Sequence, residues 1–174
     1  QRKEKGNYII SMLHPDLVHL INYQNVWDYF KAIQKFLKET GLNCFWFAPN
    51  PDPDKVLSSF YNILCSQNHL NFVTYEHMNP HKFIDMLLGA QLIIGNSSCG
   101  LREAPALLVP SINGGARQRG RERELSVSDC SFKREAIYKA LHENRGRIAG
   151  FHDPYHKGAG ERIANKILEL DLTL

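Results

Sequence analysis

The chain has 174 residues, of which 43% are apolar and 22% are charged, and its formal net charge is +3. This length suits one well-buried domain with a single core and is short for two domains. The basic residues are spread along the chain among acidic ones, so the charge indicates neither nucleic-acid nor membrane binding, while phosphorylated small molecules remain compatible with it.

Short β-branched or aromatic runs alternate along the chain with longer segments of helical period. In Val26 to Glu39, for example, the apolar residues recur at steps of three and four, as an amphipathic helix requires. The expected strands are Tyr8 to Leu13, Cys44 to Phe47, Asn71 to Tyr75, Leu92 to Gly95 and Val109 to Ile112. The expected helices are Val26 to Glu39, Val56 to Leu64, Pro80 to Leu88, Gly100 to Leu108, Lys133 to Glu143 and Gly160 to Leu170.

Alternation of strands and helices predicts right-handed crossovers into a parallel sheet with helices on both faces. We therefore expect a single Rossmann-like α/β domain over residues 1–174. In such sheets, ligands bind beyond the carboxyl ends of the strands, where loops lead into helices.

The cysteines and the apolar segments indicate the cellular location of the protein. Cys44, Cys65, Cys99 and Cys130 lie far apart without a C-x-x-C pair, which argues against a zinc knuckle and a disulfide framework. Met86 to Ile94 is the longest nearly apolar stretch and is shorter than the roughly 20 residues that cross a bilayer. Because the first residues also lack the apolar run of a signal peptide, we expect a cytoplasmic protein.

A turn of small polar residues, Asn96, Ser97 and Ser98, follows the fourth expected strand. Their hydroxyls and the free N–H groups of the next helix could bind an anion such as a phosphate. The alternative is that Asn96 or Ser97 only caps the helix, as these residue types often do. Six residues after Ser97, Glu103 could accept hydrogen bonds from the two hydroxyls of a ribose, although an acidic residue near a helix start needs no ligand to explain it.

An arginine-rich loop, G-G-A-R-Q-R-G-R-E-R, follows the fifth expected strand. Glycines free the backbone, and arginines offer planar forks that suit phosphate oxygens. We expect Arg117 to reach a diphosphate, and we expect Arg119, Arg121 and Arg123 to include ordinary solvated residues.

Two other kinds of site receive less support from the sequence. The histidines do not form the H-x-x-x-H or H-E-x-x-H pattern of a metal-binding helix, so we expect no metal and no cofactor. Ser97 or Ser98 with His14 could suggest nucleophilic hydrolysis, but G-N-S-S-C-G is not the G-x-S-x-G elbow and no third orienting residue is evident.

These segments carry a family resemblance. G-N-S-S-C-G-L-R-E followed by G-A-R-Q-R-G-R-E resembles the UDP-N-acetylglucosamine 2-epimerases, specifically the hydrolysing branch that starts sialic-acid synthesis. The non-hydrolysing branch typically has D-S-G-G-I-Q-E-E and lacks the arginine loop. I-S-M-L-H-P-D, A-P-N-P-D and D-P-Y-H-K-G-A-G-E-R-I extend the resemblance, which covers the C-terminal half of such an enzyme, a domain of GT-B type.

The resemblance implies roles for particular residues. Ser97, Ser98 and Arg117 would bind the UDP diphosphate, Glu103 would bind the ribose, and Asn50 would be a contact in the nucleotide pocket. His14 matches the family's essential histidine, which assists at the diphosphate or the sugar, and the segment Tyr75 to Pro80 matches the loop around the uracil. The chain departs from the family's usual pattern at Gly114, Ser126 and His156-Lys157, where an aliphatic residue, Asn and Gly-Asp are usual.

The reaction implied by the resemblance eliminates UDP to give a glycal and then adds water, which releases N-acetylmannosamine. It needs a base at C2 and help for the departing UDP. In the family, most groups near the sugar come from an N-terminal Rossmann domain, which this chain lacks. We therefore expect a part of a two-domain enzyme that binds UDP and UDP-N-acetylglucosamine weakly and is inactive alone.

A second function of another class stays open. The chain could be the donor-binding module of a GT-B glycosyltransferase, or a regulatory homologue without epimerase activity. The sequence also leaves the oligomeric state open, including whether the chain forms a homo-oligomer.

Overall fold

The structure, a computed structural model, describes residues 4–16, 18, 21–51, 55–67, 69–147 and 158–170. Within these ranges, six strands form one sheet in the order β3-β2-β1-β4-β5-β6, and every neighbouring pair is parallel. The strands are β1 (Tyr8–Met12), β2 (Asn43–Phe47), β3 (Phe72–Tyr75), β4 (Ile93–Gly95), β5 (Ser111–Gly114) and β6 (Val127–Cys130). The strand order reverses between β1 and β4, as in a doubly wound Rossmann sheet, so the predicted fold class is confirmed.

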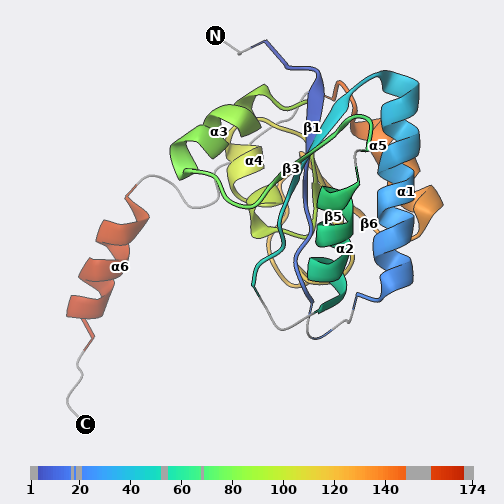
Figure 1. Cartoon of the computed structure of the whole chain (residues 1–174). Coiled ribbons are helices and arrows are strands. Elements are labelled where there is room, and N and C mark those ends of the chain that lie inside the picture. Colours follow the sequence, from blue (N-terminus) through green and yellow to red (C-terminus); the bar gives the residue numbers. More distant parts are fainter. Residues whose placement is uncertain are drawn as a thin grey trace.

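Helices cover both faces of the sheet (Figure 1). One face carries α1 (Tyr23–Thr40), α2 (Lys55–Ser66) and α5 (Arg134–Asn144). The other carries α3 (Pro80–Gly89) and α4 (Glu103–Ala106). The sheet therefore divides the core into two apolar clusters, and successive strand residues such as Ile9 and Ile10 are fully buried on opposite faces.

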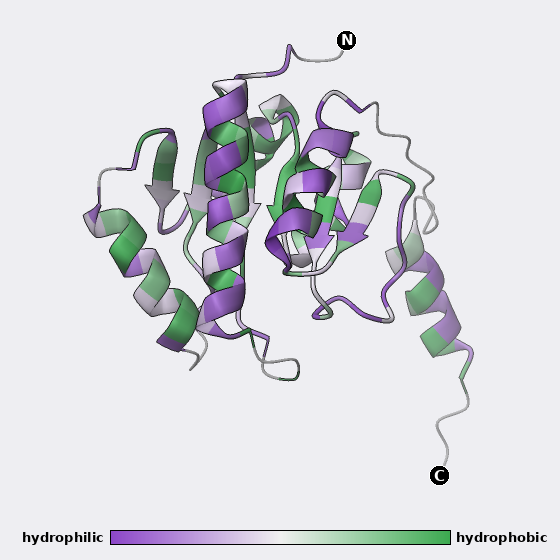
Figure 2. Cartoon of the chain, turned by 90° about the vertical axis from the view of Figure 1, so that its right-hand side faces the viewer, coloured by the Kyte–Doolittle hydropathy of each residue, from purple (hydrophilic) through white to green (hydrophobic). Residues whose placement is uncertain are grey.

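Helix α1 illustrates how the local sequence sets an element. At its start, Asn22 and Asn25 each accept a hydrogen bond from the other's backbone N–H, and Gly41 ends the helix in the left-handed conformation with φ of 68°. Between these caps the helix buries one apolar stripe, and its outer face is hydrophilic in Figure 2.

The structure differs from the prediction in two elements near the arginine loop. Strand β6 was not predicted, because Val-Ser-Asp-Cys is short and only half apolar, and it takes its place at the sheet edge by pairing with β5. The helix expected over Gly100 to Leu108 is a short 3₁₀ helix, η1 (Ser98–Gly100), followed by α4. A continuous helix is opposed by Pro105, whose ring would clash with the carbonyl of Leu101, whereas a start at Glu103 puts this proline in the first turn.

The last described helix, α6 (Ala159–Leu168), buries none of its residues and lies apart from the sheet (Figures 1 and 2). Across the described ranges, no helix combines the length and apolar character that a membrane span requires. His156 and Lys157, at which the chain departs from the family's usual pattern, lie outside the described residues.

Candidate nucleotide site

The carboxyl ends of the central strands lie side by side. Met12 of β1 pairs with both Phe47 of β2 and Gly95 of β4, and Gly95 pairs with Asn113 of β5. Gly95 has φ of 149°, and a Cβ there would lie 1.8 Å from the Met12 carbonyl oxygen. Only glycine allows β4 to come this close to β1, so the loops that follow the two strands begin in contact.

Asn96 joins these two loops. Its Oδ1 accepts a hydrogen bond from the His14 backbone N–H at 2.7 Å, and its Nδ2 donates to the His14 carbonyl, also at 2.7 Å. Asn96 is fully buried. Its side chain connects two loops of the chain and does not cap the helix, which was the simpler interpretation of the sequence. The residue that caps η1 is Ser97, whose Oγ accepts from the Cys99 N–H at 3.4 Å.

His14 and Asn50 are also in contact. The Asn50 backbone N–H donates to Nδ1 of His14 at 3.1 Å, and His14 is 6% exposed. Because Nδ1 accepts this hydrogen bond, a neutral His14 carries its proton on Nε2. The contact thus orients the His14 ring.

A cavity of about 170 Å³ lies beside this contact. His14 and Asn50 line it together with Glu76, His77 and Met78, which follow β3. The segment that the resemblance places around uracil therefore shares a cavity with two of the predicted site residues.

The serine turn carries hydroxyls and no ionised thiol. Ser97 and Ser98 are half-buried, and Glu103 is exposed at the start of α4. Burial raises the pKa of the Cys99 thiol to about 12, and the charge of Glu103 adds to this effect. Cys99 consequently stays protonated near neutral pH and cannot serve as a thiolate nucleophile.

The loops after β1, β4 and β5 meet at a junction, and the Arg117 side chain connects them there. Its Nε donates to the Pro15 carbonyl at 3.0 Å, and its Nη1 donates to the Asn96 carbonyl at 3.1 Å. Gln118 donates to the same Asn96 carbonyl at 2.7 Å. Arg117 is thus held one residue from both His14 and Ser97, although these segments are far apart in the sequence.

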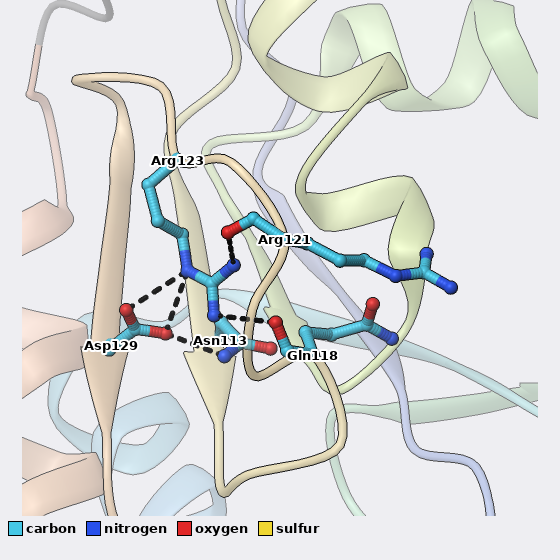
Figure 3. A network of polar contacts seen from close by, with 5 residues as sticks. All are labelled: Asn113, Gln118, Arg121, Arg123 and Asp129. Carbon is cyan, nitrogen blue, oxygen red and sulfur yellow. Dashed lines mark hydrogen bonds and ion pairs between the residues drawn. The ribbon is translucent and has the colours of Figure 1, made fainter.

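The arginine loop is held by a polar network around Arg123 (Figure 3). Arg123 forms an ion pair with Asp129 of β6 at 3.0 Å and donates to the carbonyls of Gln118 and Arg121 at 3.0 and 2.7 Å. Asp129 in turn accepts from Asn113 of β5 at 2.6 Å. Arg119 and Arg121 are exposed, as expected of solvated residues, but Arg123 is part of the structure that shapes the loop.

Two departures from the family's usual pattern lie near this loop. A Cβ at Gly114 would lie 3.1 Å from the Phe132 ring, so an aliphatic side chain there would press on this phenylalanine. Glycine at this position therefore fits the ring that packs over the end of β5. Ser126, where Asn is usual, is fully buried just before β6.

The structure brings some predicted site residues together more closely than others. His14 and Arg117 both bond to Asn96, Asn50 bonds to the His14 ring, and Ser97 and Ser98 follow Asn96 in the chain. The Glu103 side chain makes no hydrogen bond or ion pair with any described residue, but its charge acts on Cys99 in the serine turn. Sequence reasoning did not identify Asn96 and Gln118 as positioning residues. Each lies next to a predicted site residue, Ser97 or Arg117, and this adjacency could have indicated their role.

The comparisons with known proteins agree with this arrangement. A family model described as UDP-N-acetylglucosamine 2-epimerase matches residues 1–168. A UDP-N-acetylglucosamine 2-epimerase of Neisseria meningitidis serogroup B is 32% identical over 139 residues, which are 79% of this chain and 35% of that protein. A GDP/UDP-N,N'-diacetylbacillosamine 2-epimerase (hydrolyzing) of Campylobacter jejuni is 27% identical over 134 residues, 74% of this chain and 33% of that protein. The chain spans about a third of the length of these relatives.

Among solved structures, the Methanocaldococcus jannaschii UDP-GlcNAc 2-epimerase in complex with UDP-GlcNAc and UDP matches with a TM-score of 0.75. The match covers 94% of this chain and 46% of that chain, at 18% identity. This likeness is one of fold, and it confirms the expected Rossmann-like architecture of GT-B type. Since the family model extends over nearly the whole sequence, the chain belongs to the UDP-N-acetylglucosamine 2-epimerase family.

Proposed function

We propose that the chain is the UDP-binding C-terminal domain of a hydrolysing UDP-N-acetylglucosamine 2-epimerase. The complete enzyme would convert UDP-N-acetylglucosamine and water into N-acetylmannosamine and UDP. The observation that carries the proposal is the junction at the carboxyl ends of β1, β4 and β5. Here one buried asparagine, Asn96, holds the loops of His14, Ser97 and Arg117 against one another.

The diphosphate would lie at this junction. Ser97 and Ser98 offer hydroxyl donors, and the guanidinium of Arg117 adds a positive charge and planar donor geometry. Nη2 of Arg117 makes no hydrogen bond to a described residue, since the bonds to Pro15 and Asn96 use Nε and Nη1. Two of the three guanidinium nitrogens therefore orient the group and the third is available to a phosphate oxygen.

The nucleoside would occupy the neighbouring positions. The cavity of about 170 Å³ is smaller than the roughly 300–1,000 Å³ of a pocket for a whole ligand, which suits a base rather than a complete nucleotide. Glu103 would accept hydrogen bonds from the ribose hydroxyls.

His14 would assist the departure of UDP. In the elimination, a base removes the proton at C2, the C–H electron pair forms the C1–C2 double bond, and the C1–O bond breaks with its electrons moving to the β-phosphate oxygen. The resemblance to the family gives His14 this role, and the Asn50 contact, which places the proton of a neutral His14 on Nε2, orients the ring. Hydration of the glycal on the opposite face at C2 then gives N-acetylmannosamine.

We assign the base at C2 to the part of the enzyme outside this chain, since the relatives are about three times as long. The chain alone would bind UDP weakly and would not turn over the substrate. We further propose a reducing, cytoplasmic location, with which four free cysteines are compatible.

Calorimetric titration with UDP tests the site. Arg117→Ala should weaken UDP binding by about 10- to 100-fold, because it removes a charge-assisted hydrogen bond. Arg145→Ala is the matched control, since Arg145 is exposed at the end of α5 and should leave UDP affinity unchanged. Equal binding by the Arg117 variant and the unmodified chain would show that the site assignment is wrong.

Reconstitution with a separately produced N-terminal half tests the reaction. The hydrolysing reaction releases free N-acetylmannosamine and UDP from UDP-N-acetylglucosamine in equal amounts. A non-hydrolysing epimerase would instead yield UDP-N-acetylmannosamine, and a glycosyltransferase module would release neither sugar without an acceptor.

A further inference from the structure

A second cavity, of about 800 Å³, lies between the arginine loop and the start of α5. Its lining shares no residue with the 170 Å³ cavity, and none of the predicted site residues contributes to it. Its volume falls within the range of pockets that hold small organic ligands. It is therefore a separate concave surface that the proposed UDP site does not use.

The walls of this second cavity are strongly basic. Arg119, Arg121, Arg123 and Lys133 line it, and Asp129 is the one acidic residue in its lining. Four cations around one carboxylate leave an excess of three positive charges, whereas the whole chain carries only +3. The excess positive charge of the protein is thus concentrated at one concave site, which attracts anions.

Only one of the four cations is neutralised by the protein. Arg123 uses Nε, Nη1 and Nη2 in bonds to Asp129 and to the loop backbone (Figure 3). The side chains of Arg119, Arg121 and Lys133 make no hydrogen bond or ion pair within the described ranges, and in Figure 3 Arg121 extends away from the Arg123–Asp129 pair. Arg123 and Asp129 therefore form a fixed wall, and Arg119 and Lys133 are the lining cations that a ligand can use.

The rest of the lining suits a ligand with both a charged and an apolar part. Lys133 is the N-cap of the 11-residue helix α5 and makes no side-chain capping bond, so the helix dipole adds positive potential beside the lysine. Ala116 and Phe132 supply apolar surface, and the Phe132 ring is held edge-to-face against Tyr29. Gly115 and Gly120 allow close approach to the backbone.

We propose that this cavity binds a small organic phosphate. The phosphate group would lie between Arg119 and Lys133, because planar guanidinium donors and a lysine ammonium both suit its oxygens. The organic part would contact Ala116 and Phe132. Inorganic phosphate would leave most of the volume unfilled, so an apolar substituent should increase affinity.

Phenyl phosphate and inorganic phosphate are suitable probes, each titrated into the complete chain with and without saturating UDP. Phenyl phosphate should bind at least about threefold more tightly than phosphate, since the ring buries apolar surface against Phe132. Its affinity should be the same with UDP present. In nuclear magnetic resonance spectra, the amide signals of Gly115, Gly120 and Ser131 should shift on addition of the probe.

Charge reversal provides the sharpest variants. Arg119→Glu and Lys133→Glu should each weaken phenyl phosphate binding by about tenfold or more, because each replaces an attraction by a repulsion. Both residues are exposed, so circular dichroism should show an unchanged fold. Arg145→Glu changes the net charge equally at a position outside the cavity and should leave the affinity unaltered.

Three results would overturn the proposal. They are competition between phenyl phosphate and UDP for one site, equal weakening by all three charge reversals, and binding of a long polyanion such as polyglutamate but of neither small probe. Failure of the proposed UDP site is distinguishable, because Arg117→Ala should affect UDP alone and the phenyl phosphate titration does not require UDP.

Discussion

His14 and Asn96 are 82 positions apart in the sequence and exchange two hydrogen bonds of 2.7 Å, in which the asparagine side chain pairs with both backbone groups of the histidine. The contact imitates one step of strand pairing beyond the last residues of β1 and β4. It fixes the position of the His14 loop relative to the Ser97 loop. The proposed diphosphate site depends on this relative position.

Replacement of Asn96 should therefore affect stability and binding together. Asn96→Ala leaves the buried N–H and carbonyl of His14 without their partners, which should lower the free energy of unfolding by about 2–4 kcal/mol. Urea denaturation measures the loss, and Asn62→Ala is a control because Asn62 is exposed on α2. UDP affinity should fall in the Asn96 variant alone. A variant of unchanged stability would contradict the role assigned to this side chain.

Substitutions at Gly95 and Gly120 distinguish the cost of a steric overlap from the cost of a strained backbone conformation. Gly95→Ala should destabilise the protein by about 3 kcal/mol or more, because its Cβ would overlap the Met12 carbonyl in addition to the strain of φ at 149°. Gly120 also has positive φ, 80°, but has no atom within 4 Å of an added Cβ. Gly120→Ala should therefore cost only about 1 kcal/mol. Thermal unfolding of both variants would reveal whether the difference holds.

Arg123 should matter for loop shape although it is not assigned to UDP. Arg123→Met removes the ion pair with Asp129 and two bonds to loop carbonyls. Because the group is partly exposed, we expect a loss of about 1–2 kcal/mol, together with weaker UDP binding as the Arg117 loop loosens. Arg119→Met is the matched control and should change neither quantity. A double-mutant cycle with Asp129→Asn measures the coupling, and simple additivity would count against the network.

Buried thiols should make the fold sensitive to alkaline pH. The pKa of Cys99 is raised from 9.0 to about 12 and that of Cys130 likewise to about 12, in both cases mainly by burial. The unfolded state ionises first, so the stability contributed by these neutral thiols is complete below about pH 9 and is lost progressively as the pH rises toward 12. Urea midpoints at pH 8 and pH 10.5 should differ less for Cys99→Ala than for the unmodified chain.

Reactivity provides a separate check on the cysteines. At pH 8, iodoacetamide should label the exposed Cys65 first and leave Cys44 and Cys99 unmodified in the folded chain. Rapid labelling of Cys99 would mean that the serine turn is more open than the structure describes.

By itself, the sequence determined the elements and the main loops of the site. Hydrophobic periods predicted five of the six strands of the sheet, and the serine turn and the arginine loop could be recognised because each is contiguous in the chain. Tertiary structure decided the features that depend on distant partners. Strand β6 exists because β5 lies beside it, and Arg123 is fixed because Asp129 faces it from the neighbouring strand.

The same distinction applies to the residues of the site. A local pattern could identify Ser97 and Arg117 as ligand-type residues, but not Asn96 as the side chain that unites their loops, since its partners belong to β1. Periodicity records which face of an element is buried, whereas hydrogen bonds between loops depend on the order in which the strands pair. That order, with β1 beside β4, is set only when the whole sheet has assembled.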